Sequence, residues 1–276
     1  HITMAYWIQN YVLALALSVL ITGLIIPKIL LIAFRKKLFD TVDERKIHRG
    51  IVPRLGGVAF LPALIFSFCL VAGFNLHFHY AEIIPLTGVV TVPLFFLVCG
   101  AMLIYLVGMA DDLIGVRYRG KFLLQIIAAI LIMASGMWVS DLYGFLWLRS
   151  IPAWIGWIIT GFCIIYVVNA VNLIDGIDGL ASGLSAVALG WYSYVFCVYE
   201  EYAWMVLSGA TLGTLIPFFY YNVFGNPEKQ KKIFMGDTGS LTIGIMLAFL
   251  TIAVFNIPED AVSSGSNIFI MAVSPL

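Results

Sequence analysis

Long runs without Asp, Glu, Lys or Arg divide this chain of 276 residues. An α-helix needs about 20 apolar residues to cross the roughly 30 Å hydrocarbon core of a bilayer. Inside lipid the backbone must satisfy its own hydrogen bonds, and a helix does so within a single segment. Eight runs are long enough, and a ninth, 261–276, is shorter. The eight runs are residues 1–27, 55–81, 83–110, 122–140, 150–174, 179–199, 202–227 and 238–258.

The composition also indicates a membrane protein, because 62% of the residues are hydrophobic and only 11% are charged. A soluble domain is about half apolar and a quarter charged. We therefore expect an all-α, polytopic integral membrane protein with eight full transmembrane helices, a truncated ninth and the N-terminus outside. Residues 1–276 should form a single transmembrane domain that is truncated at its C-terminus. The net charge of +0 suggests no nucleic-acid partner.

The positive charge is concentrated in three connections between the runs. Thirteen of the fifteen Lys and Arg residues lie in residues 35–54, 111–121 and 225–237, which we call the three basic connections. Because Lys and Arg next to transmembrane helices favour the cytoplasmic side, these connections should be cytoplasmic. Counting the spans places the joint at 175–178 on the same side.

An amide and two carboxylates lie at that joint, between the fifth and sixth runs. Asn172, Asp175 and Asp178 are spaced three residues apart, so in a helix they would lie within roughly 120° of one face. Alternatively, the glycine after each aspartate ends the helix or lets a ligand approach the backbone. A simple polar turn needs fewer such residues. Ionisable groups at a membrane boundary are costly, and they favour a functional site.

Two adjacent carboxylates, Asp111 and Asp112, follow the third run. Because neighbouring carboxylates repel, the pair suits a bound cation or a general base with a shifted pKa. The alternative is a solvated helix end, although Asp at a helix C-terminus opposes the macrodipole. The balance favours a functional role.

The segment Gly236-Asp237-Thr238-Gly239-Ser240 opens the eighth run. Its backbone N–H groups could hold a phosphate, and the Asp237 carboxylate could bind Mg²⁺. The same residues are also suitable as a plain N-cap, since Asp, Thr and Ser all cap helices. Spacing alone leaves both interpretations open.

Basic residues provide candidate ligands for phosphate groups. The positive-inside rule accounts for the charges of the first connection, but not for His48 or the turn Pro-Arg-Leu-Gly-Gly at 53–57. Lys121, with Gln125 one helical turn later, either holds a lipid phosphate or extends its charge to the membrane surface. The candidates in the first connection are Lys46, His48, Arg49 and Arg54.

Three of these motifs resemble those of the polyprenyl-phosphate N-acetylhexosamine-1-phosphate transferases, the superfamily that includes phospho-N-acetylmuramoyl-pentapeptide transferase. They are Gly-Met-Ala-Asp-Asp at 108–112, Asn-Ala-Val-Asn-Leu-Ile-Asp-Gly-Ile-Asp-Gly-Leu-Ala at 169–181 and Phe-Met-Gly-Asp-Thr-Gly-Ser at 234–240. The similarity runs from about residue 20 to the chain end. Muropeptide enzymes usually carry Thr-Pro-Thr-Met-Gly-Gly where this chain has Pro-Arg-Leu-Gly-Gly. That difference favours the branch that transfers N-acetylglucosamine 1-phosphate or a related sugar phosphate.

The resemblance implies a phosphoryl transfer at the cytoplasmic face of the bacterial inner membrane, in the first lipid-linked step of cell-envelope polysaccharide synthesis. A UDP-N-acetylhexosamine gives its sugar 1-phosphate to undecaprenyl phosphate, whose tail lies between spans, and UMP leaves. Mg²⁺ is the implied cofactor, with Mn²⁺ as an alternative, and a homodimer in the bilayer is one option. The implied catalytic residues are Asp111, Asp112, Asp175 and Asp178; the metal ligands are Asp237 and Asp175; the substrate-binding residues are Asn172, Lys46, His48, Arg49, Arg54, Lys121, Gly236 and Thr238.

Three other functions are alternatives to sugar 1-phosphate transfer. The muropeptide branch of the same superfamily stays open. A cation-coupled secondary transporter would place acidic residues near the bilayer midplane, whereas here they gather at one surface. A CDP-alcohol phosphotransferase would carry a different Asp-Gly pattern with Ala-Arg, which this sequence lacks.

The chain is also expected to be incomplete as an enzyme. The run 261–276 is shorter than the ~20 residues of a span, and no Lys or Arg follows Lys232. Members of the resembled family continue through further spans and carry a His-rich cytoplasmic loop that faces the diphosphate. On the expected cytoplasmic side this chain has only His48. We therefore expect little or no transferase activity from the 276 residues alone.

Overall fold

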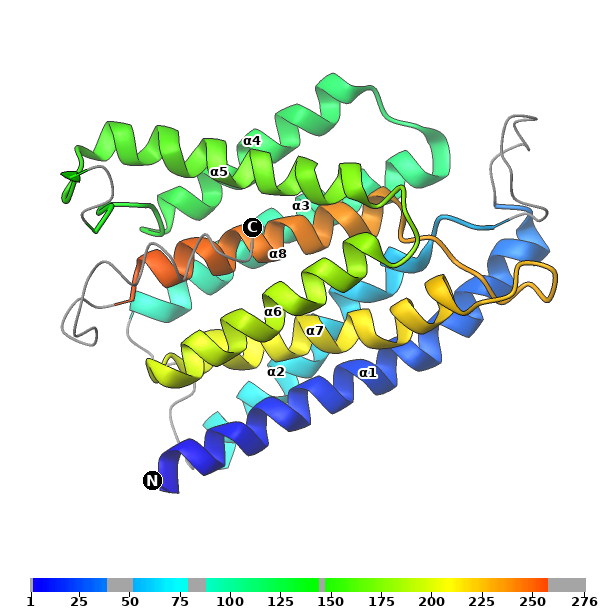
Figure 1. Ribbon diagram of the computed structural model, residues 1–276, viewed down its shortest axis with the longest axis horizontal. Coiled ribbons are helices and arrows are strands. Elements are labelled where there is room, and N and C mark those ends of the chain that lie inside the picture. Colours follow the sequence, from blue (N-terminus) through cyan, green and yellow to red (C-terminus); the bar gives the residue numbers. More distant parts are fainter. Residues whose placement is uncertain (1, 39–51, 79–87, 144–146, 258–276) are drawn as a thin grey trace.

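The computed structural model describes residues 2–38, 52–78, 88–143 and 147–257, which form a bundle of long helices (Figure 1). Within these residues the only strand-like pairing is one isolated bridge between Asp141 and Ser150. The α-helices are α1 (Ile2–Lys36), α2 (Phe60–Phe78), α3 (Gly88–Ile114), α4 (Tyr118–Ala134), α5 (Ala153–Ile174), α6 (Leu180–Val198), α7 (Tyr202–Val223) and α8 (Gly236–Phe255), and a short 3₁₀ helix, η1 (Gly56–Ala59), precedes α2.

Seven of the described helices are long and apolar enough to cross a membrane, which confirms the all-α, polytopic fold. The exception is α4, whose 17 residues extend only about 26 Å at 1.5 Å per residue. It ends at Ala134 because the chain turns at Ser135 and Gly136, and Gly136 has a φ of 96°. The number of spans and the outside N-terminus stay predictions, and the ninth run lies outside the described residues.

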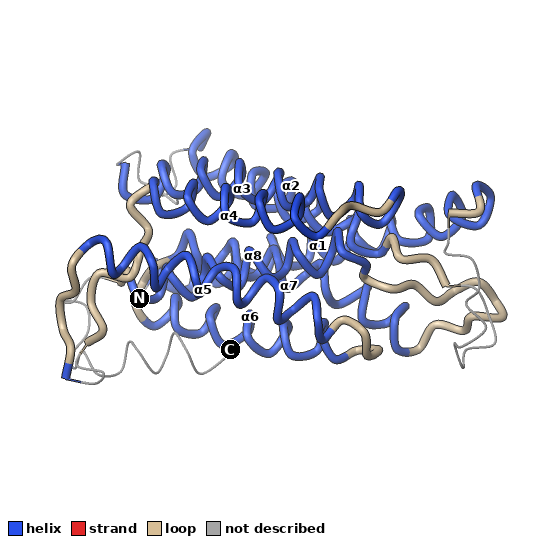
Figure 2. Tube along the Cα trace, turned by 90° about the horizontal axis from the view of Figure 1, so that it is seen from above, coloured by secondary structure: helices blue, strands red, loops and turns tan. Residues whose placement is uncertain are grey.

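The helix α8 lies in the middle of the bundle, enclosed mainly by α3, α5 and α6 (Figures 1 and 2). Every residue of α8 except Asp237 is buried. A helix that is apolar on all sides must be enclosed in this way. Hydroxyl groups within it bond to the helix itself: Thr242 donates to the Thr238 carbonyl at 2.6 Å, and Thr251 donates to the Leu247 carbonyl at 2.9 Å.

Short connections bring the polar motifs to one end of the bundle, on the right in Figure 1. The helices α3, α5 and α7 end there, and α4, α6 and α8 begin there. Three residues connect α3 to α4, and five residues, 175–179, connect α5 to α6. The motifs that are far apart in the sequence therefore meet at this end.

The turn at residues 53–57 packs against the segment that leads into α8. The Gly56 and Gly57 N–H groups donate to the carbonyls of Phe234 and Met235, both at 2.9 Å. A Cβ added at Gly57 would lie 2.0 Å from the Gly239 nitrogen, so no larger residue fits there without moving the backbone. The two glycines of Pro-Arg-Leu-Gly-Gly thus permit the close approach that positions the first turn of α8.

Candidate active site

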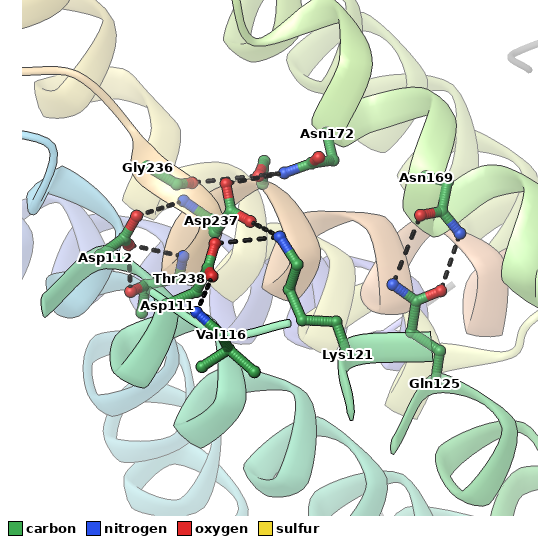
Figure 3. Close-up of polar contacts among 11 residues, drawn as sticks. Asp111, Asp112, Val116, Lys121, Gln125, Asn169, Asn172, Gly236, Asp237 and Thr238 are labelled. Carbon is green, nitrogen blue, oxygen red and sulfur yellow. Dashed lines mark hydrogen bonds and ion pairs between the residues drawn. The ribbon is translucent and has the colours of Figure 1, made fainter. Parts of the chain in front are cut away.

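The Asp237 carboxylate, in the first turn of α8, is the centre of a polar cluster (Figure 3). Its Oδ2 accepts a hydrogen bond from Lys121 Nζ of α4 at 2.7 Å, and its Oδ1 accepts one from Asn172 Nδ2 of α5 at 3.2 Å. Lys121 Nζ also donates to Asp111 Oδ2 of α3 at 2.9 Å. Four helices therefore contribute one side chain each to a single site.

The charged side chains of this cluster are partly buried but remain accessible from solvent. Asp111, Lys121 and Asp237 keep 18%, 23% and 25% of their side-chain surface exposed. In such a setting, at the end of a membrane bundle, an ion pair is screened less than on an open surface. Lys121 thus holds two carboxylates together while its ammonium stays within reach of an incoming anion.

The adjacent Asp112 has a different position from Asp111. One of its oxygens accepts the Asp237 N–H at 2.8 Å, and the other accepts the Thr238 N–H at 2.8 Å and the Thr238 hydroxyl at 2.5 Å. Asp112 therefore caps the N-terminus of α8 from a neighbouring helix, a role that Asp fills well. The backbone donors of Asp237 and Thr238, which the sequence suggested for phosphate, are occupied by this carboxylate.

Asp175 follows the last residue of α5 and is partly buried near the same cluster. Burial raises its pKa to about 7, and the negative charges of Asp112 and Asp237 act in the same direction. The Gly236 N–H and the Arg54 side chain favour the charged form but do not outweigh burial. The site thus holds more acidic groups than its nearby cations neutralise, which suits an additional cation.

The three polar residues of the central motif do not share one helical face. α5 ends at Ile174, and the chain turns through 175–179 to Gly179, which has a φ of 73°. Of the two arrangements open from the sequence, the helix end is the one that forms. Asn172 points to Asp237, whereas Asp178 pairs with Lys232 of the connection before α8.

Asn222, near the end of α7, bridges the turn 175–179 and the segment that leads into α8. Its Oδ1 accepts the Gly179 N–H at 2.7 Å, and its Nδ2 donates to the Ile233 carbonyl at 3.0 Å. Asn222, Lys232 and Ser240 were not among the residues predicted for the site. The Ser240 hydroxyl lies 2.8 Å from Asn172 Nδ2. The only signal for these three residues was their place in, or next to, a basic connection or a polar motif.

Three further residues predicted to bind substrate lie at or near the start of η1 and α8. Arg54 is exposed at the turn before η1, and Gly236 and Thr238 are buried at the start of α8. Gly236 has a φ of 74°, and a Cβ there would lie 2.3 Å from the Arg54 carbonyl oxygen. Lys46, His48 and Arg49 lie outside the described residues.

The carboxylates of the cluster are candidate ligands for Mg²⁺. Among the described residues, no three His, Cys, Asp or Glu side chains form a complete metal site. However, Asp111 and Asp237 already share one cation, the Lys121 ammonium, at 2.9 and 2.7 Å. Magnesium usually takes one or two carboxylates and completes its shell with water and substrate phosphates. The donor set of this cluster therefore fits Mg²⁺ with the substrate as a further ligand.

Two cavities lie along α5, and the first of them borders the cluster. One of about 400 Å³ lies between α4 and α5, with Lys121 and Asn172 at its polar end and Phe122 and Leu241 among its apolar walls. The other, of about 330 Å³, lies between α5 and α6, where side chains such as Val171 make it largely apolar. The first cavity could therefore accommodate an anionic head group beside Lys121, and the second offers room for an apolar chain along α5 and α6.

Residues 94–255 match the model of Glycosyl transferase family 4. The chain is 31% identical over 243 residues to the probable undecaprenyl-phosphate N-acetylglucosaminyl 1-phosphate transferase of Bacillus subtilis, covering 87% of this chain and 62% of that protein. It is 32% identical over 260 residues to the phospho-N-acetylmuramoyl-pentapeptide-transferase of Streptococcus uberis, covering 86% and 71%. A third relative, the undecaprenyl-phosphate alpha-N-acetylglucosaminyl 1-phosphate transferase of Yersinia pestis, is 25% identical over 244 residues, covering 88% and 62%.

The chain thus spans 62% to 71% of the length of these relatives. The matched segment covers more than half of the chain and contains Asp111, Asn172 and Asp237, the residues that meet at the first turn of α8. The family inferred from the three motifs is confirmed, and this chain belongs to glycosyl transferase family 4.

Proposed function

We propose that this protein transfers a sugar 1-phosphate, N-acetylglucosamine 1-phosphate or a related one, from a UDP-N-acetylhexosamine to undecaprenyl phosphate. The reaction would take place at the cytoplasmic face of the bacterial inner membrane and release UMP. The observation that carries the proposal is the convergence of Asp111, Lys121, Asn172 and Asp237 at one end of a membrane bundle. The names of the Bacillus and Yersinia relatives support the lipid acceptor.

In this reaction an oxygen of the lipid phosphate attacks the β-phosphorus of the donor. A new lipid phosphate–phosphorus bond forms, and the bond between the β-phosphorus and the oxygen bridging to the α-phosphate breaks, so UMP leaves. Both reactants are anionic, and catalysis of such a transfer rests on positioning and on neutralising charge. Cations that face a cavity and carboxylates that orient them are the groups that this chemistry requires.

Lys121 is the residue we assign to the phosphate of the acceptor or donor. Its ammonium lies at the polar end of the 400 Å³ cavity and is held in place by two carboxylates. A phosphoryl oxygen entering the cavity would replace part of that contact with a charge-assisted hydrogen bond. Arg54, exposed on the turn before η1, supplies a second positive charge near Asp175.

We assign different roles to the two adjacent aspartates. Asp111 contacts Lys121 and keeps part of its surface exposed, so it can orient the acceptor phosphate and receive its proton. Asp112 uses its carboxylate oxygens to hold the first turn of α8, and thus acts by placing Asp237. In this arrangement one aspartate of the pair touches the reactants and the other positions the site.

Asp237, with Asp111 or Asp175, would hold Mg²⁺, and Mn²⁺ offers similar chemistry. When bound, the ion supplies positive charge to the diphosphate of the donor. Asn172 keeps the Asp237 carboxylate in place through its amide at 3.2 Å. The apolar cavity between α5 and α6 offers a place for part of the isoprenoid tail.

A second candidate is transfer of phospho-N-acetylmuramoyl-pentapeptide. This candidate is favoured by the similarity to the Streptococcus uberis protein. The chain is 32% identical to that protein and 31% identical to the Bacillus subtilis protein. The sequence Pro-Arg-Leu-Gly-Gly at 53–57 favours the N-acetylhexosamine donor. Family membership gives no support to the transporter alternative.

The test is release of UMP from UDP-N-acetylglucosamine or from UDP-N-acetylmuramoyl-pentapeptide, with and without undecaprenyl phosphate and Mg²⁺. Because the relatives are longer, the natural gene product should be assayed beside the 276-residue chain, with the Bacillus subtilis relative as a positive control. Release that requires the lipid and the metal supports the proposal, and the donor used identifies the branch. No release from the natural gene product with either donor, while the control is active, would overturn it.

A further inference from the structure

One helical turn from the polar cluster, towards the middle of α4 and α5, two amide side chains face each other between these helices (at the right in Figure 3). We propose that Gln125 and Asn169 form a positioning pair that sets the distance between Lys121 and Asn172 at Asp237. The proposal rests on the function proposed above, and neither amide is assigned a contact with substrate.

The pair is well satisfied. Asn169 Nδ2 donates to Gln125 Oε1 at 2.7 Å and to the Ile165 carbonyl at 2.7 Å, so both of its hydrogens are used. Gln125 Nε2 makes a longer return contact of 3.4 Å to Asn169 Oδ1. Gln125 is 4% exposed, and Asn169 is the side chain with which its amide pairs. A buried amide that has one available partner holds its neighbour in a defined place.

Apolar packing alone does not fix α4 against α5 at this level. α4 packs mainly on α3 and shares a smaller contact with α5. The cavity of about 400 Å³ separates the two helices next to the cluster, and both amides line it. In lipid, apolar helices gain little from association itself, so small contacts and polar pairs decide their relative position. The amide pair is a hydrogen-bonded contact between α4 and α5 beside this cavity.

The spacing along the helices connects the pair to the site. Lys121 lies four residues before Gln125, a rise of about 6 Å along the axis of α4. Asn172 lies three residues after Asn169, a rise of about 4.5 Å along the axis of α5. Residues at these spacings share a helix face, so all four side chains point to the interface. Lys121 and Asn172 then meet on the two oxygens of Asp237. A shift of α4 along α5 would move one of these contacts relative to the other.

The decisive variant replaces both amides by apolar side chains of similar size, Gln125→Met with Asn169→Leu. Because no amide is left unpaired, the protein should fold with nearly unchanged thermal stability. We expect kcat for UMP release to fall between about 10- and 100-fold, as for a misplacement near 1 Å, with a smaller change in KM. The exchanged pair, Gln125→Asn with Asn169→Gln, keeps one amide on each helix and should recover most of the rate.

A matched control exists at the other end of the bundle. Asn75 Nδ2 donates to Asn10 Oδ1 at 2.8 Å, which is also a buried amide pair between two helices, α1 and α2. The double variant Asn10→Leu with Asn75→Leu also removes the acceptor of the Tyr6 hydroxyl, so it should cost more stability. Its kcat should nevertheless stay within about twofold of the parent, which separates positioning from general stability.

A second readout does not depend on activity. Spin labels at the lipid-facing positions Leu123 of α4 and Phe162 of α5, which are 57% and 72% exposed, report the distance between the helices. The Met/Leu variant should broaden or shift the distance distribution, and the exchanged pair should restore it. An unchanged distribution or an unchanged kcat in the Met/Leu variant would overturn the inference. The variants are made in the natural gene product. If that parent releases no UMP while the Bacillus subtilis relative does, the proposed function fails, whereas the distances still decide the structural part.

Discussion

Asp112→Ala should destabilise this protein far more than Asp111→Ala, although the two residues are neighbours. The Asp112 carboxylate accepts the N–H groups of Asp237 and Thr238, both at 2.8 Å, and the Thr238 hydroxyl at 2.5 Å. Thr238 is 0% exposed, so water cannot replace the lost acceptor without opening the start of α8. Asp111→Ala instead removes contacts to the Val116 N–H and to Lys121, which keeps Asp237 as a partner.

The magnitude follows from these contacts. One buried donor left unsatisfied costs about 1–3 kcal/mol, and replacing a helix N-cap by Ala costs about 0.5–2 kcal/mol. The two costs overlap, so we expect roughly 3 kcal/mol for Asp112→Ala and about 1 kcal/mol for Asp111→Ala. At about 2–4 °C per kcal/mol for a chain of this size, Tm should fall by roughly 6–12 °C and about 2–4 °C.

Thermal unfolding in detergent, followed by tryptophan fluorescence, measures both values. Activity should fall by at least about 10²-fold in either variant, the lower range for loss of a general base or of its site. Only stability then separates the two roles. Equal losses of Tm, or a larger loss for Asp111→Ala, would refute the assignment of Asp112 as the cap of α8.

Three further outcomes are expected. Asp237→Asn should abolish UMP release but keep the fold, and near-normal rates at low Mg²⁺ would contradict the metal assignment. Gly57→Ala should lower stability by about 1–3 kcal/mol, because its Cβ would lie 2.0 Å from the Gly239 nitrogen, whereas Gly73→Ala, with nothing within 4 Å, should be close to neutral. Single cysteines in the three basic connections should resist membrane-impermeant maleimide in intact cells, and strong labelling of any of them would overturn the predicted topology.

The general fold could be predicted from the sequence for a simple physical reason. A long segment without charges can enter lipid only if it satisfies its own backbone, and so the uncharged runs indicated helices. Charges are excluded from those runs, so the charged side chains of the site had to lie at their ends. The run 122–140 shows where this reasoning stops. Its helix α4 begins earlier, at Tyr118, and ends at Ala134, because Gly136 turns the chain before the apolar residues end.

The candidate site was predictable as a set of motifs, but its internal arrangement was not. Whether Asp111 and Asp112 act alike depends on which neighbour each one meets. Asp112 meets the start of α8, more than 100 residues away in the sequence, whereas Asp111 meets Val116 and Lys121 nearby. The same holds for the Gln125–Asn169 pair, which sequence spacing alone could not bring together.

The sequence by itself determined that this chain forms membrane helices and carries the acidic motifs of its family near their ends. Only the tertiary structure decided that Asp112 caps α8, that Lys121 joins Asp111 to Asp237, and that Asp178 pairs with Lys232. The reason is physical: a run of apolar residues fixes a helix through bonds within itself, whereas the direction and partner of a polar side chain depend on how distant helices pack against each other.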